Sequence, residues 1–139
     1  MKKAIFFSLG FLILSGCKIL AYKKYAEPLS ISFGSGGGFT GARNEFILQG
    51  NGQLKAIKPF TTDTTVITTL SKKVYKSIFN QLESKTLSKL SYEKPGNMTN
   101  FITFYNKGEL KKNFQWEQGS EIPKELKELY NTLIQLTKK

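Results

Sequence analysis

Residues 100–116 read NFITFYNKGELKKNFQW and predict a β-hairpin. The stretch Asn100–Tyr105 is rich in residues that favour strands, and the Asn-Lys-Gly triplet at 106–108 supplies a turn whose glycine suits a left-handed position. The return segment alternates apolar and polar side chains as far as Trp116, a period of two that is typical of a strand. Such alternation indicates an antiparallel sheet that packs against the core on one face and is exposed to solvent on the other.

Two segments with a helical period lie on either side of this hairpin. The first runs from Ser71 to about Ser84, and its apolar side chains at Val74, Ile78 and Leu82 fall on one stripe. The second follows Pro123, which fits the first turn of a helix because its missing N–H would be unpaired there. Its broad apolar face consists of Leu126, Leu129, Tyr130, Leu133, Ile134 and Leu136.

Three further strands are expected before the first helix, at Leu29–Phe33, Ala42–Gln49 and Gln53–Lys58. The threonine-rich stretch 61–69 is either a strand or a loop, and 87–97 is expected to be a loop. The order is therefore βββ-α-ββ-α. It predicts an α+β fold in which an antiparallel sheet of about five strands has two amphipathic helices on one face, all within one domain of residues 29–139.

The N-terminus resembles a bacterial lipoprotein signal. Lys2 and Lys3 precede an apolar run of about 13 residues, which is shorter than the roughly 20 that a spanning helix needs. The run closes on the lipobox-like sequence Leu14, Ser15, Gly16 and Cys17. The resemblance implies a signal peptide at 1–16, lipid on Cys17 and a lipidated tether at 17–28, so that the membrane becomes a partner of the chain.

The residue after the lipobox bears on localisation. Lys18 stands where an inner-membrane retention signal would have an aspartate, and no acidic run follows Cys17. This pattern resembles that of lipoproteins sorted to the outer membrane and facing the periplasm. We therefore expect a lipid-anchored protein of the bacterial cell envelope, on the periplasmic face of the outer membrane.

The composition argues against an enzyme. Cys17 is the only cysteine and there is no histidine, so thiol catalysis and the commonest general base and metal ligand are excluded. Asp63 is the only aspartate, and the glutamates at 121, 125 and 128 fit an exposed helical face better than a catalytic pair. We expect no catalytic residues, no bound metal and no cofactor.

The chain is strongly basic, with 21 Lys and Arg against 10 Asp and Glu and a formal net charge of +11. All of the basic residues except Arg43 are lysines, and they are scattered along the chain. Bidentate recognition of phosphate favours arginine, so we do not expect a nucleic-acid partner. A binder of anionic glycans or lipid headgroups remains an alternative.

A glycine-rich segment is the most unusual local feature of the domain. A phosphate-binding loop would need Gly-Lys-Ser/Thr, and a dinucleotide fingerprint would need a following helix, and neither is present. The segment is interpreted as a wide turn with Phe39 filling the core, or alternatively as a partner-binding loop. Its residues are Gly34, Ser35, Gly36, Gly37, Gly38, Phe39, Thr40 and Gly41.

Three motifs together resemble the emfourin family, small bacterial inhibitors of thermolysin-like metalloproteases. They are Ser-Gly-Gly-Gly-Phe-Thr-Gly at 35–41, Phe-Ile-Thr-Phe-Tyr at 101–105, and Ile-Pro-Lys-Glu-Leu-Lys-Glu-Leu at 122–129. The chain is also similar to small lipoproteins of unassigned function from Bacteroidota, which share the Gly-Gly-Gly-Phe-Thr-Gly element. The emfourin resemblance, over about residues 29–136, implies occlusion of a protease cleft by the loop at 34–41.

The function expected from the sequence is non-enzymatic. We expect a lipid-anchored protein that binds another protein of the cell envelope, as an accessory subunit of a membrane complex. The alternatives are an emfourin-like inhibitor of a thermolysin-like metalloprotease and a binder of anionic glycan or lipid headgroups.

Overall fold

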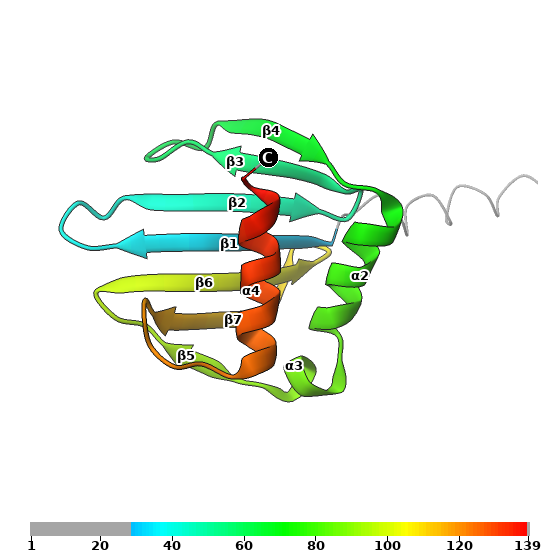
Figure 1. Cartoon of the computed structure of the whole chain (residues 1–139). Helices are drawn as coiled ribbons and strands as arrows, with labels where there is room; N and C mark the ends of the chain where they lie inside the picture. The colour runs from blue at the N-terminus through cyan, green and yellow to red at the C-terminus, as the bar shows by residue number, and fades with distance from the viewer. Residues whose placement is uncertain (1–28, 139) are drawn as a thin grey trace, which may run out of the picture.

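The computed structural model describes residues 29–138 and consists of a seven-stranded sheet with all its helices on one face (Figure 1). The predicted signal peptide, Cys17 and the tether lie outside the described residues. The elements are β1 (Ser30–Gly37), β2 (Arg43–Gln49), β3 (Gln53–Ile57), β4 (Thr64–Thr69), α2 (Lys72–Leu82), α3 (Lys85–Lys89), β5 (Tyr92–Lys94), β6 (Met98–Asn106), β7 (Glu109–Glu117) and α4 (Lys124–Leu136).

The strands lie in the order β4-β3-β2-β1-β6-β7-β5. Every neighbouring pair is antiparallel except β5 and β7, which are parallel. The α+β class is therefore confirmed, but the expectation of about five strands, all antiparallel, is wrong. The added strands are β4, which has no apolar alternation, and β5, which is too short at three residues to have a detectable period.

The pairing register brings the apolar side chains of the central strands onto one face. Phe33 of β1 lies opposite both Phe46 of β2 and Ile102 of β6, and cross-strand partners point to the same side of a sheet. The Phe33 and Phe46 rings stack with their centroids 5.7 Å apart. This is the face that the helices cover (Figure 1).

The helices complete one hydrophobic core. On α4, Leu126, Leu129 and Leu133 are fully buried, as their spacing predicts. On α2 the buried residues are Ile78, Phe79 and Leu82. Val74, expected on the same stripe, is 40% exposed because it lies in the first turn of α2, outside the buried part of that helix.

The glycine-rich segment is mostly strand. Gly34, Gly36 and Gly37 belong to β1, which pairs with β2 on one side and β6 on the other, and only residues 38–42 form the connecting loop. Gly34 has φ +152°, and a Cβ there would lie 1.9 Å from the carbonyl oxygen of Asn44. The expected wide turn from 34 to 41 is therefore much shorter, and glycine is required at 34 by the close approach of β2.

Candidate functional site: loop tips and the uncovered sheet face

Two exposed phenylalanines stand at the same end of the sheet. The β1–β2 loop at 38–42 carries Phe39, which is fully exposed, and the β3–β4 loop at 58–63 carries Phe60, which is 81% exposed. Both loops project from the end of the sheet opposite to the start of β1 (Figure 1). The interpretation that Phe39 fills the core is wrong, because β1 continues to Gly37 and carries Phe39 past the last residue that the helices cover.

Phe60 has an unusual backbone conformation. Its φ is +61°, in the left-handed region that bulky side chains avoid. Such a conformation costs about 1–3 kcal/mol and persists only where the surrounding structure imposes it. Packing of the side chain within the domain offsets little of this cost, because most of its surface faces solvent.

Hydrogen bonds hold both loops in shape. In the β3–β4 loop, the Lys58 N–H donates to the Asp63 carbonyl (2.9 Å), and the Asp63 N–H donates to the Thr61 hydroxyl (3.1 Å). In the β1–β2 loop, the Gly38 N–H donates to the carbonyl of Asn97 (2.8 Å). The two rings are therefore presented on short, braced turns.

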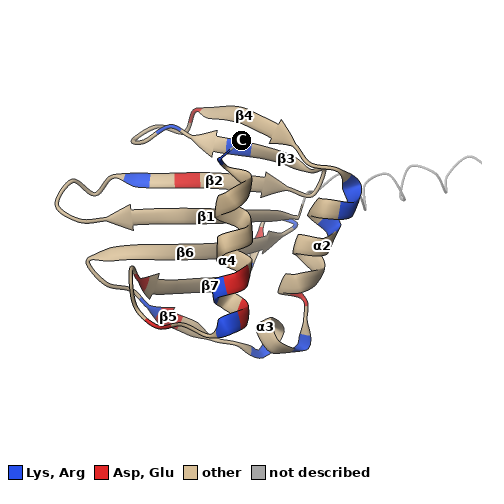
Figure 2. Ribbon diagram, viewed as in Figure 1, with Lys and Arg blue, Asp and Glu red and all other residues tan. Residues whose placement is uncertain are grey.

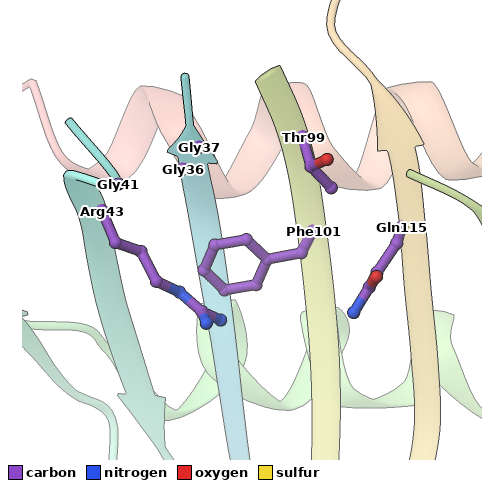
Figure 3. Close-up of a pocket in the computed structure, with 7 residues that line it drawn as sticks. All are labelled: Gly36, Gly37, Gly41, Arg43, Thr99, Phe101 and Gln115. Atoms are coloured by element: carbon purple, nitrogen blue, oxygen red, sulfur yellow. The ribbon is translucent and has the colours of Figure 1, made fainter. Parts of the chain in front are cut away.

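The sheet face without helices has a shallow depression of about 290 Å³ (Figure 3). Phe101 points toward this face, yet it is only 4% exposed, because its ring lies beside glycines of β1 that have no side chains to displace it. The Arg43 guanidinium stacks on the ring at 3.9 Å from the centroid. The depression is lined by Gly36, Gly37, Gly41, Arg43, Thr99, Phe101 and Gln115.

Arg43 is also held by an ion pair. Its Nε lies 3.1 Å from Oε2 of Glu45, and Glu45 in turn accepts a hydrogen bond from the Ser32 hydroxyl. These contacts fix the position of the guanidinium, while 53% of its side-chain surface remains exposed. The arrangement provides a preset cation on the sheet face without helices.

Tyr130 joins α4 to the sheet near the glycine segment. Its hydroxyl donates to the Gly34 carbonyl (3.1 Å) and lies 3.1 Å from Oδ1 of Asn100. Its ring meets Trp116 edge to face, with centroids 4.9 Å apart. Burial raises the pKa of Tyr130 to about 12, because the charged phenolate would lose its hydration.

The carboxylates considered from the sequence lie in the β3–β4 loop and in or just before α4. Asp63 lies in the β3–β4 loop, Glu121 precedes α4, and Glu125 and Glu128 lie on exposed positions of α4. Within residues 29–138 no group of three or more His, Cys, Asp or Glu is placed to hold a metal ion. No helix in that same part of the chain is long and apolar enough to cross a membrane.

The sequence indicated only part of this surface. Gly38–Gly41 and Phe39 do lie in a loop, whereas Phe60 and the Arg43–Phe101 contact were not anticipated. A phenylalanine directly after Pro59 in a polar stretch was the available indication for an exposed ring. Leu14, Ser15, Gly16 and Cys17 lie outside the described residues.

No protein-family model matches the chain, and no curated protein matches it. The resemblance to emfourins therefore stays a prediction.

Proposed function

We propose that this chain is a lipid-anchored, non-enzymatic protein of the bacterial envelope that binds another envelope protein through Phe39 and Phe60. The observation that carries the proposal is the placement of two exposed phenylalanines on neighbouring loop tips. Single exposed apolar residues are normal on soluble proteins. Two braced aromatic tips, one of them in a strained conformation, fit a contact surface better.

The energetic argument rests on the area of the two rings. Burying a phenylalanine side chain contributes about 1.5–3 kcal/mol, so both rings together supply roughly 3–6 kcal/mol to association. Aromatic side chains are also enriched among the residues that dominate binding energy. The strain at Phe60 supports the same proposal. A backbone conformation that lowers the stability of the free domain is expected where the residue has another role, such as contact with a partner.

The direction of the loops suits an anchored protein. The chain enters the domain at Leu29, at the start of β1, and the two tips lie at the far end of that strand. Eight residues of β1 span about 26 Å at roughly 3.3 Å each. A lipid on Cys17 would therefore hold the domain by one end and leave the phenylalanine tips directed to a partner.

The test is affinity purification of the tagged full chain from membranes in mild detergent, followed by mass spectrometry. The wild type is expected to retain a stoichiometric protein partner. The double variant Phe39→Ser with Phe60→Asn should lose it, since asparagine tolerates the left-handed conformation and leaves the fold intact. Leu110→Ser is the matched control, because Leu110 is 58% exposed at the opposite end of the sheet.

Two results would count against the proposal. One is the absence of any stoichiometric partner for the wild type. The other is equal retention of the partner by the double variant and by Leu110→Ser. A Cys17→Ser chain tests the anchor separately, because loss of the lipid should release the protein from membranes without affecting the loop tips.

Inhibition of a metalloprotease is a second candidate, favoured by the full exposure of Phe39 on a narrow hairpin loop. A projecting aromatic tip could enter a protease cleft and block it, as the resemblance to emfourins implies. Titrating a thermolysin-like protease with the chain decides the matter. Stoichiometric inhibition that Phe39→Ser removes would support this candidate, and full protease activity at a large excess of the chain would exclude it.

A further inference from the structure

The two edges of the sheet are protected very differently. The β5 edge has three residues, two of them the exposed charges Glu93 and Lys94, and Pro95 follows directly. Short length, charge and proline are the usual means of blocking an edge strand. The β4 edge has six residues, Thr-Thr-Val-Ile-Thr-Thr, with neither charge nor proline.

The outer side of β4 is open to another strand. β4 pairs only with β3, and no other strand within residues 29–138 lies beside its outer edge (Figure 1). Thr64, Thr65, Val66 and Thr69 are exposed, and threonine and valine favour strand structure. The one protective device is a bulge at Ile67, which has no partner on β3.

The charges around β4 indicate what could pair with it. Lys58 lies in the loop before β4, and Lys72 and Lys73 begin α2 directly after it, whereas Asp63 is the only nearby acid in sequence. The β4 ribbon itself carries no charge, and basic residues mark the start of α2 (Figure 2). An extended segment with acidic residues at its ends would match this pattern.

A second copy of the chain matches the pattern less well. Each copy has a formal net charge of +11, so two copies repel one another at long range. Antiparallel self-pairing would also bring Lys72 and Lys73 of one copy to the end of β4 that follows Lys58 and Asp63 in the other, so that three lysines would meet a single acid. The surrounding charge therefore favours an acidic partner over self-association.

We propose that β4 is an acceptor edge that binds an extended, acidic-ended segment of another protein as an eighth strand of the sheet. Backbone hydrogen bonds along Thr64–Thr69 would supply the pairing, as in other cases of strand addition. Lys58, Lys72 and Lys73 would orient the segment through its acidic ends. Lys58 shares the β3–β4 loop with Phe60, but the strand pairing itself runs along Thr64–Thr69 and can be tested separately from the phenylalanine tips.

The test uses the full chain in mild detergent and a fluorescein-labelled probe peptide, Asp-Glu-Thr-Val-Thr-Val-Thr-Glu-Asp. Anisotropy should report saturable binding, and the largest backbone amide shifts should fall on Thr64–Thr69. A peptide with all central amides N-methylated keeps the side chains but cannot extend a ladder, and it should bind at least tenfold more weakly. A version with lysines at both ends should lose a similar factor.

Charge variants of the protein give a matched comparison. Lys72→Glu with Lys73→Glu should weaken probe binding several-fold. Lys85→Glu with Lys89→Glu, the same change on α3 near the other side of the domain, should leave it unchanged.

Three outcomes would overturn the proposal. Equal binding of the N-methylated peptide would show that no ladder forms. Amide shifts confined to α2 would show attraction to lysines only. A concentration-dependent dimer that Val66→Lys abolishes would assign the edge to a second copy.

Discussion

Replacing Gly34 by alanine is expected to damage the centre of the sheet severely. Gly34 lies in β1 opposite Glu45 of β2 and Phe101 of β6. An added Cβ would sit 1.9 Å from the Asn44 carbonyl oxygen and 3.0 Å from its carbon. Ordinary contacts begin near 3.4 Å, and the obstacle is backbone, so β1 and β2 must move apart by more than 1 Å.

The magnitude follows from three contributions. The backbone conformation at φ +152° costs an alanine about 1–3 kcal/mol. Separating the strands leaves one or two buried backbone groups poorly paired, at about 1–3 kcal/mol each. The smaller entropy of the unfolded alanine chain offsets about 0.4–1 kcal/mol. We therefore expect Gly34→Ala to lower the free energy of unfolding by about 3–5 kcal/mol.

Urea denaturation of residues 29–139, followed by fluorescence of the single tryptophan Trp116, measures this effect. Trp116 is 3% exposed, so its emission should change on unfolding. The control is Gly41→Ala, because Gly41 also has positive φ (+62°) but no atom lies within 4 Å of its added Cβ. The control should lose only about 1 kcal/mol, and a Gly34→Ala loss no larger than that would refute the steric reasoning.

Three further changes test the network around this glycine and the loop tips. Arg43→Ala should lower the free energy of unfolding by about 1 kcal/mol in thermal melts, because the stacking on Phe101 and an ion pair are lost. The control Lys111→Ala breaks only an exposed ion pair and should cost less than about 0.5 kcal/mol. Equal losses for the two variants would contradict the stacking argument. Tyr130→Phe should cost about 1 kcal/mol at pH 8. Burial raises the Tyr130 pKa to about 12, from an unfolded value near 10, so the stability due to the neutral phenol is complete below pH 10 and is lost between pH 10 and 12. The difference in urea midpoint between wild type and Tyr130→Phe should therefore become smaller over that pH range. A constant difference would count against the raised pKa. Phe60→Asn should raise unfolding free energy by about 1 kcal/mol, since asparagine relieves the left-handed strain, and an unchanged or lower value would disprove that strain.

Long periodic segments were predictable from local sequence. The helix after Pro123 was expected with the correct buried face, and in the hairpin Phe114 and Trp116 are buried as their alternation predicts. Leu110, expected on the same packed face, is 58% exposed. Period and turn chemistry act over a few residues, so a single chain segment contains the information for them. The α+β class follows from those segments alone.

The strands β4 and β5 were not predictable in this way. β5 has only three residues and becomes a strand because β7 offers it a parallel partner. β4 has threonines on both sides and gains its structure from pairing with β3. In both cases the neighbouring strand, rather than the local pattern, determines the conformation.

The same distinction between local pattern and tertiary contact applies to the candidate surface. The sequence by itself determined a basic α+β domain with one cysteine and no histidine, and a loop that contains Phe39. Only the tertiary structure decided that Gly34–Gly37 are strand, that Phe39 and Phe60 are exposed at one end, and that β4 is an open edge. These features depend on which strands meet and how closely their backbones approach, and such contacts join residues far apart in the chain.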